Sequence, residues 1–280
     1  MPKPEVLLSG LAFGEGPCWR DDRLWFSDMH RDRVQTVDLA GNVETIVEVP
    51  QRPSGLGWLP DGRLLVVSMV DRKLLRLDDD GLTEVADLTP HATWHCNDMV
   101  VDAQGRAYVG NFGWDIEASQ DPVPTTLVMV TPEGETRVVA RDLIFPNGTV
   151  ITPDGKTMIL GETFAARLSA FDIHDDGTLS ERRDWATLEG CVPDGICLDE
   201  EGAVWLACPM SGQVVRVREG GEVTDRIPVE TLAFACMLGG PQRRHLFICT
   251  SKHSAAAECR AEHTGRIEVV EVDVPGAGLP

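Results

Sequence analysis

Four oxygen-bearing side chains stand in short turn-like motifs spread along the 280-residue chain. They are Glu15 in Gly-Glu-Gly-Pro, Asn97 in Cys-Asn-Asp, Asn147 in Pro-Asn-Gly and Asp194 in Pro-Asp-Gly. Asn and Asp are common turn residues because their side chains bond the local backbone, so one such motif alone indicates only a turn. Brought together, two carboxylates and two amide oxygens would form the kind of ligand set that Ca²⁺, Mg²⁺ or Mn²⁺ prefers.

The positions of these motifs follow an internal repeat. One phrase recurs six times: a small or polar turn, an apolar run, a tight turn and a second apolar run. The copies begin about 40 to 50 residues apart, the period of a four-stranded propeller blade, at Gly14, Pro53, Cys96, Pro146, Pro193 and Phe234. An alternating segment such as Leu75-Arg76-Leu77 follows, as half-buried strands require. The sequence therefore predicts an all-β fold, a six-bladed β-propeller of four-stranded blades, with residues 1–280 in one domain.

The sixth module ends early. It contains "HLFICTS" and "GRIEVVEVDV" but no fourth strand, whereas the chain begins with an isolated apolar strand, "EVLLSG". We expect this N-terminal strand to complete the last blade, because such closure ties the two ends of the ring together and removes a free edge. A TIM barrel is the main rival at this length, but it requires eight helices and the sequence shows no convincing amphipathic helix.

Composition argues against several classes of protein. The net charge of −20 disfavours a duplex-binding protein, which needs a basic face. No apolar run approaches the length of a membrane span, and the N-terminus lacks the pattern of a signal peptide. The eight cysteines form no C-x-x-C pair and mostly stand in apolar stretches, where free cysteine is a small hydrophobe. We expect a cytoplasmic monomer or weak homo-oligomer that acts on a small molecule, with no nucleic-acid or membrane partner.

Closure of six blades brings equivalent positions of the modules to one axis. From the first module to the sixth these positions hold Glu15, Ser54, Asn97 followed by Asp98, Asn147, Asp194 and Ala235. Two uncompensated carboxylates buried side by side would repel each other and be costly to desolvate. A hard divalent cation would remove that cost, and the lack of clustered Cys and His at these turns disfavours a dedicated zinc site.

The stretches "GEGPCW", "CNDMVVDAQGR", "FPNGTVITPDGK" and "PDGICLDEEGAVWLA" resemble, in this order and spacing, motifs of the senescence marker protein / gluconolactonase / luciferin-regenerating enzyme family. The resemblance covers nearly the whole chain. It implies a six-bladed propeller with one divalent cation in the channel mouth, Ca²⁺ being favoured over Mg²⁺, Mn²⁺ or Zn²⁺. By motif match, the metal ligands are Glu15, Asn147 and Asp194. Asp194 also matches the family's general base, and Asn97 matches a position that contacts substrate or metal-bound water.

One position departs from the family's pattern. Sugar-lactonase members commonly carry Arg two residues before that Asn, and here His95 stands there in "TWHCND". A neutral imidazole lacks the fixed cationic fork of Arg, which argues against a simple aldonolactone specificity while leaving the metal ligands intact. His95 is either a substrate contact or a hydrogen-bonded rim histidine. Its neighbour Trp94 is either a pocket wall or a buried anchor.

The segment of residues 111–126 is the longest insertion between strands of one module. Insertions on one face of a repeat array often form the binding face, so we expect this loop to overhang the channel mouth. Trp114 and Glu117 are its candidate substrate contacts. The alternative is a solvated loop without a role in binding.

These residues predict a divalent-metal-dependent hydrolase of small cyclic esters, such as a sugar lactone or a related lactone. The cation would polarise the carbonyl, and either Asp194 would accept a proton from the attacking water or a metal-bound water would be the nucleophile. A phosphotriester or fluorophosphate hydrolase on the same metal site is one alternative. A calcium-binding propeller without catalysis is another.

Overall fold

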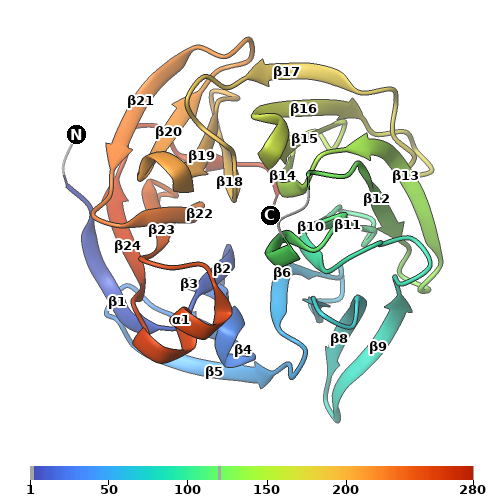
Figure 1. The fold of residues 1–280 in the computed structure, drawn as a ribbon, viewed down its shortest axis with the longest axis horizontal. Helices are drawn as coiled ribbons and strands as arrows, with labels where there is room; N and C mark the ends of the chain where they lie inside the picture. Colours follow the sequence, from blue (N-terminus) through green and yellow to red (C-terminus); the bar gives the residue numbers. More distant parts are fainter. Residues whose placement is uncertain (1–2, 119–120, 280) are drawn as a thin grey trace.

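The computed structural model describes residues 3–118 and 121–279, which form six antiparallel sheets arranged as blades around a central axis (Figure 1). The predicted six-bladed β-propeller is confirmed. In five blades the first strand of a repeat is the innermost strand of its sheet, and in the fifth blade a short C-terminal strand pairs on its inner side. The first strands contact those of the neighbouring blades.

The first three blades follow the sequence in order. Blade 1 contains β2 (Gly14–Arg20), β3 (Arg23–Asp28), β4 (Arg33–Val37) and β5 (Val43–Glu48). Blade 2 contains β6 (Pro53–Trp58), β7 (Leu64–Ser68), β8 (Lys73–Asp78) and β9 (Gly81–Asp87). Blade 3 contains β10 (Cys96–Val101), β11 (Ala107–Asn111), β12 (Thr125–Val130) and β13 (Thr136–Leu143).

The other three blades include both ends of the described chain. Blade 4 contains β14 (Pro146–Ile151), β15 (Thr157–Glu162), β16 (Arg167–Asp172) and β17 (Arg183–Thr187). Blade 5 contains β18 (Ile196–Asp199), β19 (Val204–Cys208), β20 (Gln213–Val217), β21 (Val223–Pro228) and a short fifth strand, β25 (Gly276–Ala277). Blade 6 contains β22 (Leu232–Gly239), β23 (His245–Ser251), β24 (Gly265–Glu271) and β1 (Glu5–Leu11).

The N-terminal strand closes the ring as expected. β1 pairs antiparallel with β24, with Glu5 opposite Val269 and Leu11 opposite Gly265, and forms the outermost strand of blade 6. The blade therefore joins the first described strand to the last full strand of the chain (Figure 1). This arrangement holds the ring together without a gap between blades 6 and 1.

Burial explains why inner and outer strands differ in composition. The inner strands β10 and β14 are buried along their whole length, because other blades cover them on both faces. Outer strands such as β5 expose most of their residues. Glycine lets the inner strands approach closely: a Cβ built on Gly55 would lie 2.4 Å from the Met99 backbone nitrogen, and one on Gly148 would lie 2.5 Å from the Ile196 nitrogen.

The connections between the second and third strands of the blades lie on the same rim as the starts of the inner strands. They carry the short helices η1 (Met29–Arg31), η2 (Ile116–Ala118), η3 (Thr163–Ala165) and η4 (Pro209–Ser211), together with α1 (Ala256–Glu262). No sequence pattern predicted α1, which spans seven residues, has no side-chain N-cap and buries only Cys259. Two turns are too short to display a helical repeat of apolar residues.

The C-terminal segment lies at the opposite end of the inner strands. β25 pairs with the last residues of β18, and Leu279 bridges Ile151 at the end of β14. This contact leaves the rim with the short helices as the side from which a ligand can approach the axis. In the described residues, no helix is long and apolar enough to cross a membrane.

The expectation that the cysteines are free hydrophobes is wrong for two of them. Cys191, just before β18, forms a disulfide with Cys208 at the end of β19, 17 residues later. The other six cysteines are free and buried, as expected. The pairing was not visible in the sequence because it depends on the antiparallel return of β19 beside the segment that leads into β18.

Candidate functional site

Five of the six inner strands begin with a break in their pairing register, and β18 pairs with β19 without one. The shifts fall between Glu15 and Cys18 in β2, between Cys96 and Met99 in β10, and between Pro146 and Thr149 in β14. Such bulges re-aim the side chains at the end of a strand and are common next to active sites. The predicted turn is therefore a bulged strand start in these blades. Only Asp194 precedes its strand, β18.

Hydrogen bonds join the predicted residues across four blades. The Ser54 hydroxyl donates to Asn97 Oδ1 at 3.4 Å. Asn97 Nδ2 donates to Asn147 Oδ1 at 3.0 Å, and Asn147 Nδ2 donates to Asp194 Oδ1 at 2.5 Å. We call this set, together with Glu15, the axial polar cluster. The structure thus brings together residues that are up to 179 positions apart, from Glu15 to Asp194.

Thr163 supports this cluster and was missed by sequence reasoning. It is the first residue of η3, and its hydroxyl donates to the Pro193 carbonyl at 2.8 Å while accepting from Asn147 Nδ2 at 3.1 Å. The side chain therefore links Asn147 to the backbone immediately before Asp194. No local motif marks Thr163, since its role depends on how β15 ends beside the neighbouring blade.

The surroundings of Glu15 and Asp194 disfavour the ionised form of both carboxyl groups. Burial, followed by the negative charges of Asp194 and Asp98, raises the pKa of Glu15 well above its ordinary value. Burial and the charge of Asp98 likewise raise the pKa of Asp194, and the hydrogen bond from Asn147 only partly opposes this. A neighbouring positive charge would lower both pKa values again.

The donor atoms of the cluster fit a hard divalent cation. Carboxylate and amide oxygens are the ligands that such ions prefer, and the repulsion between Glu15 and Asp194 is what a cation would relieve. Across the described residues, no group of three or more His, Cys, Asp or Glu side chains could hold a metal ion. The predicted set, Glu15, Asn147 and Asp194, has only two such side chains and relies on an amide oxygen as its third ligand.

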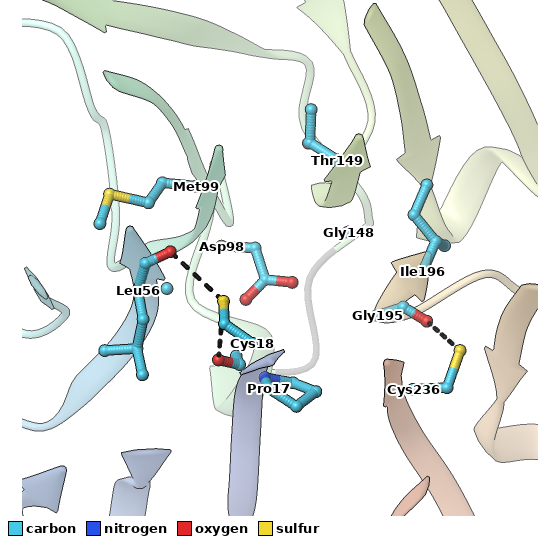
Figure 2. A pocket seen from close by; sticks show the side chains of 12 residues that line it. Pro17, Cys18, Leu56, Asp98, Met99, Gly148, Thr149, Gly195, Ile196 and Cys236 are labelled. Carbon is cyan, nitrogen blue, oxygen red and sulfur yellow. Dashed lines mark hydrogen bonds between the residues drawn. The ribbon is translucent and has the colours of Figure 1, made fainter. Parts of the chain in front are cut away.

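A second layer lies one residue further along each inner strand. It is made of four glycines, one carboxylate and one thiol: Gly16, Gly55, Asp98, Gly148, Gly195 and Cys236. These residues line a cavity of about 20 Å³, into which the Asp98 carboxylate points (Figure 2). A cavity of this size has room for about one water molecule.

Asp98 is the one carboxylate of this layer, and it is poorly hydrogen-bonded. Its Oδ1 is buried and has no hydrogen-bond partner among the described residues. Burial raises the pKa of its carboxyl to about 6. The thiols of Cys18 and Cys236 lie in the lining of the same cavity, and burial raises the pKa of both. Cys18 donates weakly to the carbonyls of Gly16 and Leu56 (Figure 2).

His95 and Trp114 belong to a different group of side chains. We call it the rim aromatic cluster: Trp94, His95, Phe112, Trp114, Phe145 and Phe164. The His95 ring stacks on Trp94 with centroids 4.9 Å apart and lies 6.0 Å from Phe112. Trp114 is only 6% exposed and packs edge-on against Phe145 and Phe164.

The remaining predicted contact is Glu117. Its backbone lies in η2, within the long connection between β11 and β12, and its side chain lies outside the described residues. The second Pro-Asp-Gly sequence of the chain, at Pro153-Asp154-Gly155, forms the exposed hairpin between β14 and β15. Asp154 accepts hydrogen bonds only within this hairpin, from the Thr152 hydroxyl and the Lys156 backbone, among the interactions of the described residues.

The chain is similar to known proteins in sequence and in fold. Residues 13–252 match the model of the SMP-30/Gluconolactonase/LRE-like region. The chain is 28% identical to 6-deoxy-6-sulfogluconolactonase from Pseudomonas putida, covering 98% of this chain and 96% of that protein. It is 25% identical to the pentonolactonase XacC from Haloferax volcanii, covering 90% and 86%. A crystal structure of the calcium-binding protein regucalcin from Agrobacterium tumefaciens superposes with a TM-score of 0.82 at 22% identity, covering 100% and 96%.

Proposed function

The chain belongs to the SMP-30/gluconolactonase/LRE-like family, and from this we propose that it is a divalent-metal-dependent hydrolase of small lactones. The observation that carries the proposal is the meeting of Glu15, Asn97, Asn147 and Asp194 at one end of the propeller axis. The names of the two lactonase relatives support a lactone as substrate. The name of the regucalcin neighbour supports a cation.

Glu15, Asn147 and Asp194 would hold the cation. When bound, the cation would supply Lewis-acid chemistry, polarising the lactone carbonyl and stabilising the negative charge that develops on its oxygen. Its charge would also keep both carboxylates ionised, in spite of the burial that raises their pKa values.

The other atoms of the cluster have separate tasks. Asn97 is held between Ser54 and Asn147, so its amide is oriented to hydrogen-bond a substrate oxygen. Asp194 receives the Asn147 amide on Oδ1, which leaves Oδ2 to accept a proton from an attacking water. The water oxygen adds to the carbonyl carbon, the ring C–O bond breaks, and the leaving oxygen takes up a proton to give the hydroxy acid.

A lactone panel tests this proposal, with hydrolysis followed by acid release after chelation and after metal add-back. We expect Asp194→Asn and Glu15→Gln to lower kcat/KM by at least about 10³-fold, as loss of a charge-stabilising group does. Asp154→Asn is the matched control, because it changes the same Pro-Asp-Gly tripeptide in an exposed hairpin. Full activity of either axial variant, or activity that survives chelation, would refute the proposal.

A further inference from the structure

A substrate of this site must lie on the rim rather than in the channel. The cavity beneath the axial polar cluster has a volume of about 20 Å³, enough for about one water molecule and far too small for a lactone ring. At the other end, β25 and Leu279 contact the inner strands. The side chains around the rim therefore contact the part of the substrate that does not react.

On the side of blades 3 and 4, these side chains form the rim aromatic cluster. Phe112 stacks on Phe145 with centroids 4.4 Å apart, and Phe164 packs edge-on against Phe145 at 5.2 Å. The backbone of Phe145 has φ of +55°, a left-handed conformation that bulky residues rarely adopt. Phe145 stands two residues before Asn147, so this end of the cluster is joined through the backbone to an axial residue.

Two further links connect the cluster to the axial residues. Phe164 follows Thr163, whose hydroxyl bonds Asn147 and the backbone before Asp194. His95, which packs between Trp94 and Phe112, stands two residues before Asn97. Any ligand held by Asn97 and Asn147 is thus adjacent in the fold to aromatic rings.

Apolar side chains continue around the rest of the axis. Phe13 stands two residues before Glu15 and packs edge-on against Phe234 of blade 6, with centroids 4.7 Å apart. Phe112 packs against the same group, which also includes Met69 of blade 2. The polar cluster is therefore surrounded on several blades by apolar residues.

Part of this apolar surface is exposed although the protein is strongly acidic. Phe164 in η3 is 52% exposed, Met210 in η4 is 82% exposed and Ile116 in η2 is 45% exposed. All three lie in rim connections between second and third strands. Exposed large apolar side chains on the rim that carries a polar site are typical of binding surfaces for apolar ligands.

We propose that the substrate is a lactone with an apolar aryl or alkyl substituent that packs against Phe164 and the rim aromatic cluster. The proposal rests on the lactonase function proposed above and adds the substrate class. A polyhydroxylated lactone would place hydroxyl groups against the exposed Phe164 ring, which offers them no hydrogen bond, and each unsatisfied hydroxyl would weaken binding. An aryl or alkyl group in the same place exchanges water for ring contacts.

Two lactones of equal ring size test the substrate class in the metal-loaded enzyme: dihydrocoumarin, with a fused aryl ring, and D-glucono-1,5-lactone, with hydroxyl groups. We expect kcat/KM for dihydrocoumarin to be at least about tenfold higher, and Phe164→Ala to lower this preference about five- to tenfold by removing one aromatic contact. Val6→Ala is the control, because Val6 is 51% exposed but lies in the outermost strand of blade 6. A preference for the gluconolactone, or an unchanged preference in Phe164→Ala, would overturn the inference.

A binding experiment separates this inference from the proposed function. The corresponding lactams, 3,4-dihydro-2-quinolinone and D-gluconolactam, resist hydrolysis, and calorimetry measures their affinities whether or not the protein is catalytic. We expect the aryl lactam to bind at least about tenfold more tightly, and Phe164→Ala to reduce that difference. Tight binding of the aryl lactam without turnover of any lactone would refute the function but support the apolar specificity. Equal or tighter binding of the gluconolactam would refute the specificity whatever the activity.

Discussion

Asp98→Asn should stabilise the protein when no cation is bound. Asp98 is 9% exposed, its Oδ1 has no hydrogen-bond partner among the described residues, and burial raises its pKa from 3.8 to about 6. The substitution keeps the shape of the side chain and removes its charge. It also removes a negative charge that raises the pKa of Glu15 and Asp194.

The sign and size follow from proton linkage. Because the pKa of Asp98 is higher in the folded state, the folded protein binds more protons than the unfolded chain between pH 3.8 and about 6, and stability falls as pH rises through that window. The difference between 3.8 and about 6 corresponds to about 3 kcal/mol, since one pKa unit is worth about 1.4 kcal/mol. Asp98→Asn has no carboxyl at this position, so its stability should not fall for this reason as pH rises.

Urea unfolding followed by tryptophan fluorescence in the presence of a chelator measures the effect. The quantity compared is the free energy of unfolding of Asp98→Asn minus that of the wild type. We expect this difference to be about 3 kcal/mol larger at about pH 8 than at about pH 4. The comparison between pH values cancels any constant effect of the new amide. The reasoning fails if the difference between variant and wild type is the same at both pH values, or if the variant loses stability relative to the wild type as pH rises.

Three other substitutions test contacts that hold the site. Thr163→Val should cost about 1–3 kcal/mol in unfolding free energy and weaken cation binding in calorimetry, because two buried hydrogen bonds lose their shared hydroxyl, whereas Thr163→Ser should retain both. Cys191→Ser should cost about 3 kcal/mol by opening the 17-residue loop to Cys208, and the same loss on reduction of the wild type would confirm that the disulfide is responsible. Gly195→Ala should destabilise the protein more than Gly155→Ala in thermal unfolding, because a Cβ at Gly195 would lie 2.5 Å from a Cβ of β22. Gly155 in the hairpin has open space, and only its φ of +71° opposes a Cβ there. Equal effects of the two substitutions would contradict this packing.

The sequence was sufficient for the architecture because a propeller is encoded locally. Each blade repeats its own turns and alternating strands, so the number of blades and the role of "EVLLSG" as the closing strand could be read from spacing alone. The same repeat aligned Glu15, Asn97, Asn147 and Asp194 at equivalent positions of their modules. Residues equivalent in a closed repeat meet at its axis, whatever their separation along the chain.

What the repeat could not supply are contacts between residues that are not equivalent. Thr163 bonds Asn147, Cys191 bonds Cys208, and Phe164 packs on Phe145, in each case because a connection of particular length folds back over the rim. The bulges that turn the inner strand starts toward the axis also depend on pairing with the second strand. The spacing of residues in the sequence does not show where these connections and side chains point.

The sequence by itself determined the fold and which side chains reach the axis, because both follow from a short-range pattern repeated six times. Only the tertiary structure decided their surroundings. It left Asp98 Oδ1 without a hydrogen-bond partner among the described residues, in the wall of a cavity too small for substrate, and it placed aromatic rings beside the polar cluster. Burial, charge repulsion and ring packing depend on all neighbours in space, and those neighbours come from different blades.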